Sequence, residues 1–134
     1  LANLISRFRP GEVSDKQREA QYSFTPNDIR RAIINRELVL HHQPKVTTHS
    51  GVMRGVEALV RWEHPDRGRV MPDQFIPQSE SSGEIHPVGA WVIDEACRQL
   101  ATWRASFEDD FFVSVNMAAR QLRQPNFAWT AASV

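Results

Sequence analysis

Hydrophobic and polar positions along the chain switch repeatedly between the spacing of a helix and the alternation of a strand. Apolar residues recur at three- and four-residue intervals in some segments and form short, dense runs in others. These patterns predict, in order, a helix over residues 26–36, strands over 38–43 and 52–62, a short helix opening at 72–76, a longer helix over 88–104, a strand over 111–116 and a helical segment over 118–123. This order of helices and strands is typical of an α/β architecture.

Local signals mark where these elements begin and end. Thr25, Pro26 and Asp28 supply a helix N-cap, a proline at the first helical position and an acid three residues after the cap. Pro44 is expected to end the first strand, and residues 64–68 have the composition of a loop. The first two strands are close enough in sequence to pair as a hairpin. The longer helix is predicted to carry one apolar stripe, formed by Val88, Val92, Ala96, Leu100 and Trp103.

Composition places the chain among ordinary globular proteins. Its 134 residues suffice for one domain with a hydrophobic core, and 41% of them are hydrophobic and 24% charged. Lysine and arginine number 16, and aspartate and glutamate also number 16, so the net charge is zero. Neutrality argues against bulk binding to a nucleic acid polymer or an anionic membrane, although one or two arginines can still hold a small anion. No apolar run approaches the roughly 20 residues that a membrane-spanning helix needs.

Cysteine and histidine favour neither a disulfide nor a zinc site. Cys97 is the single cysteine, so an intramolecular disulfide is excluded and a reducing compartment is favoured. We expect Cys97 to be a small core residue rather than a nucleophile. The spacing of the five histidines resembles no zinc pair. The tryptophans at positions 62, 91 and 103 are expected to pack in the core.

The second predicted strand carries the most informative polar residues. Side chains alternate between the faces of a strand, so Glu57, Leu59 and Arg61 share one face. Four strand residues span roughly 13 Å, and the two charged groups therefore cannot simply pair with each other. Each needs a partner outside the strand, such as a metal ion for the carboxylate and a phosphate for the guanidinium.

A third candidate residue, Asn116, ends the third predicted strand. That strand is almost wholly apolar, as buried parallel strands are. Ligands of α/β proteins collect at the carboxyl ends of the strands, where Asn116 and Arg61 both lie with Glu57 slightly deeper. Amide and carboxylate oxygens are suited to Mg²⁺, Mn²⁺ or Ca²⁺. The alternative is structural: Glu57 and Arg61 join networks inside a barrel, and Asn116 caps the following helix.

Several ordered segments resemble one known family. Glu57-Ala58-Leu59 followed by Arg61-Trp62 resembles the signature of EAL domains, the bacterial phosphodiesterases that act on cyclic di-GMP. Supporting segments stand in the family's order, at residues 42–46, 72–80, 89–93 and 114–118, the last followed by Gln121 and Leu122. The resemblance extends over about residues 26–127 and is far more specific than the three-letter signature.

The resemblance implies a TIM-like barrel whose first strand runs antiparallel to the rest. It implies hydrolysis of cyclic di-GMP to linear pGpG with two Mg²⁺ or Mn²⁺ ions. Matched to the family's motifs, Glu57 is the catalytic residue and a metal ligand, and Asn116 is a second metal ligand. Arg61 matches the phosphate-binding arginine, while Gln43 and Leu59 match residues that contact the dinucleotide.

The chain departs from the family in how much of the barrel it contains. A TIM barrel takes about 250 residues and eight strands, whereas about three strands are predicted here. After Asp110 the sequence contains no aspartate, glutamate or lysine, so the family's later carboxylate ligands and its catalytic lysine are not matched. We therefore expect residues 25–134 to be a truncated EAL domain, inactive by itself. Residues 1–24 are expected to be an arm from a preceding GGDEF or sensory domain.

An open sheet edge and an uncovered apolar face are further expected to make the chain self-associate. The resemblance also implies a location in the bacterial cytoplasm. Two rival interpretations remain open at this stage. The chain is either a catalytically dead EAL-like module that binds cyclic di-GMP or a protein partner, or a truncated product with no function of its own.

Overall fold

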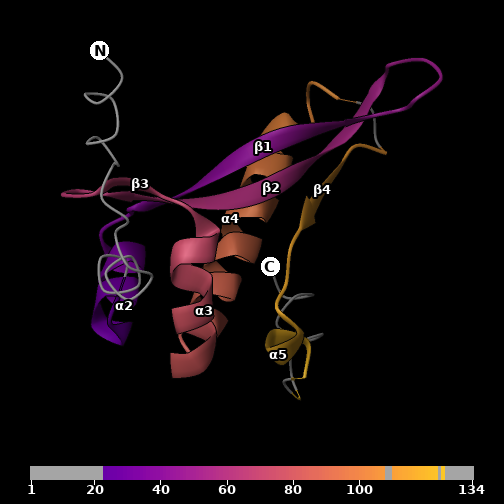
Figure 1. The fold of residues 1–134 in the computed structure, drawn as a ribbon. Coiled ribbons are helices and arrows are strands. Elements are labelled where there is room, and N and C mark those ends of the chain that lie inside the picture. Colours follow the sequence, from indigo (N-terminus) through magenta and orange to yellow (C-terminus); the bar gives the residue numbers. More distant parts are fainter. Residues whose placement is uncertain (1–22, 108–109, 124, 126–134) are drawn as a thin grey trace, which may run out of the picture.

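A computed structural model of the chain describes residues 23–107, 110–123 and 125. The predicted arm over residues 1–24 lies outside this part except for its last two residues. In chain order, the elements are α2 (Pro26–Ile34), β1 (Leu38–Val46), β2 (Met53–His64), β3 (Gly68–Val70), α3 (Pro72–Ser82), α4 (Ile85–Trp103), β4 (Phe112–Val115) and α5 (Ala119–Leu122) (Figure 1). The mixture of helices and strands confirms the predicted α/β class.

The sheet is built around β2. β1 and β3 both run antiparallel to β2, and β4 runs parallel to it. The helices α2, α3 and α4 lie on the same side of the sheet (Figure 1). The sheet is open, and the predicted hairpin between the first two strands and the antiparallel first strand are both confirmed.

The described part contains four strands, not three, because the predicted loop over residues 64–68 leads directly into β3. Trp62 pairs with Val70, and the Arg69 Nε atom lies 2.6 Å from Glu63 Oε1 across the same turn. A strand of three residues is too short to display an alternating pattern, so no periodic signal predicts it. Its pairing depends on tertiary contacts instead, because the Val70 side chain is buried in the core cluster.

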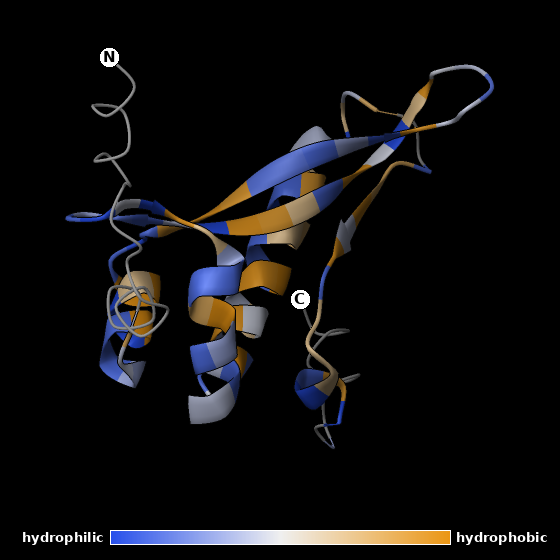
Figure 2. Cartoon of the chain, viewed as in Figure 1, coloured by the Kyte–Doolittle hydropathy of each residue, from blue (hydrophilic) through white to orange (hydrophobic). Residues whose placement is uncertain are grey.

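β1 continues through Pro44, which was expected to end it. Pro44 lies opposite Val56 in the antiparallel register, and the strand reaches Val46. Among the described strands, β1 pairs only with β2 and therefore forms an edge. A proline lacks the N–H that a central strand must donate, but an edge strand tolerates this loss on its outer side. Figure 2 fits this position, since β1 is hydrophilic along its centre and β2 largely hydrophobic.

The start of α2 follows its sequence signal. The Thr25 hydroxyl accepts the Asp28 N–H at 3.2 Å, and the Asp28 carboxylate accepts the Thr25 N–H at 2.9 Å. The helix ends at Ile34, two residues earlier than predicted, because Arg36 adopts the left-handed conformation with φ of 58°. At the start of the helix, the N–H groups of Thr25 and Asp28 are both satisfied by these two reciprocal hydrogen bonds.

The core lies between the sheet and the three helices. Trp62 of β2 is 1% exposed and meets Phe75 of α3 edge-on, with ring centroids 5.6 Å apart. Phe24, just before α2, is also buried and packs on Trp62 at 4.4 Å. The buried cluster consists of Phe24, Ile29, Ala32, Leu38, Trp62, Val70, Phe75, Val88 and Val92. Trp62 thus fulfils the core prediction, whereas the tryptophans at 91 and 103 are half-buried.

α4 begins at Ile85, three residues before the predicted start, and buries the first part of its predicted stripe. Val88, Val92 and Ala96 are buried, while the stripe becomes half-buried toward the end of the helix. Cys97, which was expected in the core, is exposed. It lies one position past Ala96, so the helical rotation of about 100° per residue turns its side chain away from the sheet. No helix in the described part of the chain is long and apolar enough to cross a membrane.

Candidate functional site

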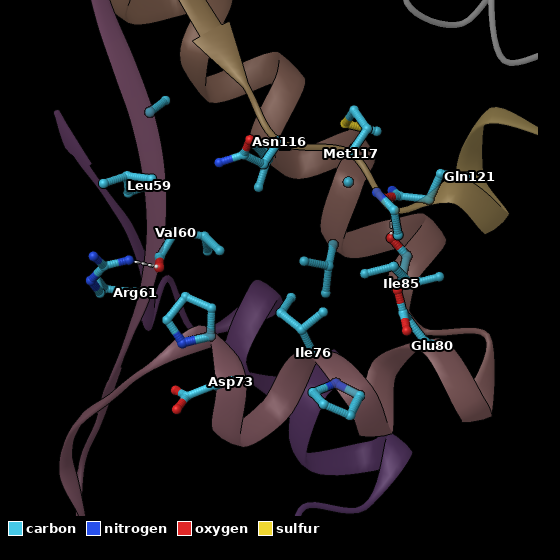
Figure 3. A pocket seen from close by; sticks show the side chains of 17 residues that line it. Leu59, Val60, Arg61, Asp73, Ile76, Glu80, Ile85, Asn116, Met117 and Gln121 are labelled. Carbon is cyan, nitrogen blue, oxygen red and sulfur yellow. Dashed lines mark hydrogen bonds between the residues drawn. The ribbon is translucent and has the colours of Figure 1, made fainter. Parts of the chain in front are cut away.

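The polar candidates of β2 stand on one face of the strand, as the alternation predicts. Glu57, Leu59 and Arg61 are half-buried, while Val56 and Ala58, on the other face of the strand, are buried toward the helices. Leu59 and Arg61 point away from the side of β2 that α3 occupies (Figure 3). The face that carries the candidate residues is therefore the one opposite the helical layer.

Glu57 and Asn116 meet, although they are far apart in the sequence. The parallel register pairs Glu57 of β2 with Ser114 of β4, which places Asn116 just beyond the end of β4. There the Asn116 Nδ2 atom donates a hydrogen bond to Glu57 Oε1 at 2.7 Å. The alternative role of Asn116 as a helix cap is wrong, because the residue at the N-cap of α5 is Ala118.

Glu57 has a second partner, Lys45, which the sequence analysis missed. The Lys45 Nζ atom of β1 lies 3.3 Å from Glu57 Oε2. The hydrogen bond from Asn116, together with the contact and charge of Lys45, holds the pKa of Glu57 below its ordinary value. Lys45 follows Pro44, where the first strand was expected to end, so the predicted hairpin was too short to bring it to Glu57.

Arg61 does not pair with Glu57, in agreement with the distance expected along the strand. Its Nη1 atom donates a hydrogen bond to the carbonyl oxygen of the neighbouring Val60 at 2.7 Å. This bond engages one edge of a half-buried guanidinium that has five N–H donors. The remaining donors suit an anionic oxygen, which is the ligand that the sequence pattern favours.

Gln43 and Leu59 complete the set of sequence candidates. Gln43 of β1 is exposed and lies directly opposite Glu57, so both side chains project from the same face of the sheet. Leu59 pairs with His41 and lies between Glu57 and Arg61 on that face. All five candidates thus belong to one region formed by β1, β2 and the end of β4.

A cleft of about 370 Å³ borders this region on the helical side of β2. Ile76 of α3 and Ile85 of α4 belong to its apolar lining, and Asp73 and Glu80 add carboxylates (Figure 3). Asn116 lies at the boundary, because it lines the cleft and also bonds to Glu57 on the other face. The stretch after β4 therefore joins the polar face of the sheet to the cleft.

The chemistry of Glu57 and Asn116 fits part of a divalent cation site. Carboxylate and amide oxygens are hard ligands of the kind that Mg²⁺ and Mn²⁺ prefer. Rotating the Asn116 amide by half a turn would exchange its nitrogen for its carbonyl oxygen and present that oxygen beside the Glu57 carboxylate. Within the residues that the structure describes, however, no group of three or more histidine, cysteine, aspartate or glutamate side chains could hold a metal ion.

Comparison with known proteins identifies the family. The profile of the EAL domain matches residues 26–133, so the chain belongs to the EAL domain family. A bifunctional diguanylate cyclase/cyclic di-GMP phosphodiesterase, MucR of Pseudomonas aeruginosa, is 50% identical over 95 residues, which are 71% of this chain. The cyclic di-GMP phosphodiesterase PdeR of Escherichia coli is 45% identical over 106 residues, or 79% of this chain.

The chain spans only a small share of these relatives, 14% of MucR and 16% of PdeR. Among solved structures, the PaMucR phosphodiesterase in complex with c-di-GMP has a TM-score of 0.76 and 44% identity. That match covers 80% of this chain and 43% of the solved chain. The described residues are therefore a mixed α/β part of the EAL fold with an open sheet of four strands, and a closed TIM barrel is not seen in them.

Proposed function

We propose that the chain supplies the first part of the active site of an EAL-type cyclic di-GMP phosphodiesterase. In this proposal Glu57 and Asn116 are ligands of Mg²⁺ or Mn²⁺, and Glu57 is the catalytic residue. Arg61 binds a phosphate of the dinucleotide, and Gln43 and Leu59 contact the remainder of it.

One observation carries the proposal: the 2.7 Å contact between Glu57, inside β2, and Asn116, just past the carboxyl end of the parallel strand β4. These residues lie 59 positions apart in the sequence, and their contact depends on the register of β2 and β4. The relatives whose names state cyclic di-GMP phosphodiesterase activity are 45–50% identical across this part of the chain. Identity at this level supports a common substrate class.

The state of Glu57 suits the proposed role. Because hydrogen bonding from Asn116 and Lys45 lowers its pKa, Glu57 is a carboxylate at neutral pH. When bound, a divalent cation would act as a Lewis acid and lower the pKa of a water molecule for attack on the phosphodiester. Arg61 would neutralise phosphate charge from the same face of β2, where it lies beyond Leu59.

The proposal includes a limit on what this chain does alone. One carboxylate and one amide supply too few oxygen ligands to hold two divalent cations. We therefore expect the 134 residues to hydrolyse cyclic di-GMP only if other residues complete the site. A cytoplasmic location, a preceding GGDEF or sensory domain and self-association belong to the same proposal.

The test is cyclic di-GMP turnover by the 134-residue chain with Mn²⁺ or Mg²⁺, measured as pGpG formation, beside a Glu57→Ala variant. We expect no turnover from either chain when circular dichroism shows both to be folded. Formation of pGpG that disappears in Glu57→Ala would overturn the expected inactivity and mean that a second copy supplies the missing ligands.

A titration with cyclic di-GMP then tests the substrate class. Weaker binding by Arg61→Met than by the unmutated chain supports it, and no binding by the unmutated chain contradicts it.

A further inference from the structure

The stretch that presents Asn116 is anchored at two points. Residues 116–118 connect β4 to α5, and their first residue bonds to Glu57 of β2. Their last residue, Ala118, is held by Gln121 of α5. Gln121 in turn bonds to Ile85 at the start of α4, so this connection joins the candidate metal ligands to the helical layer.

Gln121 makes two hydrogen bonds with its side-chain amide while only 3% of the residue is exposed. Its Oε1 atom accepts the Ala118 N–H at 2.9 Å, and its Nε2 atom donates to the carbonyl oxygen of Ile85 at 2.8 Å. Ile85 begins α4, so the amide links the start of that helix to the stretch after β4. A buried amide with both ends satisfied holds a defined geometry, because breaking either bond leaves a buried polar group unpaired.

Gly89 provides the space that this amide needs. A Cβ atom at Gly89 would lie 1.6 Å from Gln121 Nε2 and 2.9 Å from Gln121 Cδ. Glycine is thus the residue that lets the amide cross α4 and reach Ile85. In Figure 3 the Gln121 side chain extends toward Ile85, with Met117 and Asn116 on the preceding stretch.

We propose that Gln121, seated over Gly89, is a positioning residue that sets Asn116 against Glu57. It fixes Ala118 relative to the first turn of α4, and this leaves residues 116 and 117 little freedom to move the Asn116 amide. The inference rests on the proposed function only for the meaning of the Glu57–Asn116 pair as metal ligands. The geometry itself can be tested without metal or substrate.

The test uses the side-chain amide signal of Asn116 in NMR spectra of the 134-residue chain, assigned by its absence from Asn116→Ala. In the unmutated chain we expect a nuclear Overhauser contact between this amide and the Glu57 methylene protons. Gln121→Met keeps the buried volume but removes both hydrogen bonds. We expect it to lose the contact and to move the amide signal toward that of an exposed asparagine. Gln99→Met is the matched control, since in the described part of the chain the Gln99 side chain bonds within α4, to Glu95 at 3.1 Å.

A pair of variants separates positioning from general loss of structure. Gly89→Ala should lose the Asn116–Glu57 contact because its methyl group occupies the place of the Gln121 amide. The double variant that combines Gly89→Ala with Gln121→Ala should behave as Gln121→Ala alone does. The reason is that removing the Gln121 amide relieves its clash with the methyl group added at position 89. If the two substitutions instead changed the Asn116 signal independently, the inference that Gly89 makes room for the Gln121 amide would be wrong.

Two results would overturn the inference. One is a folded Gln121→Met chain in which the Asn116 signal and its contact with Glu57 are unchanged. The other is an unmutated chain without that contact. If Gln121→Met unfolds, Gly89→Ala gives the same readout with Gln121 retained. Because turnover does not enter the test, failure of the proposed phosphodiesterase function would leave its outcome intact.

Discussion

At the scale of single residues, the pKa of Glu57 depends on its two partners, Asn116 and Lys45. Asn116→Leu should raise the pKa of Glu57 most, since its hydrogen bond is the largest cause of the lowered value, and Lys45→Met should raise it less. A lowered folded pKa gives stability that is present above the unfolded pKa and lost as the pH falls through the folded pKa. Both variants should therefore lose less stability than the unmutated chain on acidification. The measurement is an NMR titration of the Glu57 carboxyl carbon.

Arg54→Met is the control for this titration, because Arg54 belongs to β2 but pairs with Asp110 at 2.8 Å rather than with Glu57. If Arg54→Met shifted the Glu57 titration as much as Lys45→Met, the assigned causes would be wrong. A titration that Asn116→Leu leaves unchanged would contradict the hydrogen bond itself.

The same residues show how far sequence reasoning reaches. Period-two alternation places Glu57, Leu59 and Arg61 on one face, because that pattern depends on the strand alone. The role of Lys45 depends on the strand register and on an edge strand that accommodates Pro44, neither of which the alternation encodes. Cys97 was misplaced because the helical stripe is narrow and a shift of one position turns a side chain to solvent.

At the scale of elements, the pairing of β2 with β4 determines whether Glu57 and Asn116 meet. Gly55 of β2 lies opposite Phe112 of β4, and a Cβ atom there would be 2.4 Å from the Phe112 carbonyl oxygen. Gly55→Ala should force β4 away and lower the free energy of unfolding by about 1–3 kcal/mol. The measurement is urea unfolding followed by circular dichroism.

Val52→Ala is the matched substitution, since Val52 is 48% exposed just before β2 and should change stability by less than about 0.5 kcal/mol. Equal stabilities for the two variants would mean that the strands separate without cost. Sequence patterns predicted both β2 and β4 but not this close approach. A glycine in a strand signals a close backbone contact without naming the partner.

At the scale of the whole molecule, the open sheet makes association the expected behaviour of the chain. In the described part, β4 pairs only with β2, and Phe112 at its start is 44% exposed. Leu122 of α5 is 56% exposed, and residues 116–118 between β4 and α5 line the apolar cleft. An exposed strand edge beside apolar surface favours pairing with another chain.

We expect the chain to form oligomers whose mass rises with concentration in sedimentation equilibrium. Phe112→Lys should shift the distribution toward monomer, because a charged side chain on an edge strand opposes strand pairing. Thr48→Lys, a change in the exposed turn between β1 and β2, adds the same charge outside β4 and should leave the distribution unchanged. A monodisperse monomer of the unmutated chain across the micromolar range would contradict the expectation. It would mean that this open sheet is stable in solution without a partner strand.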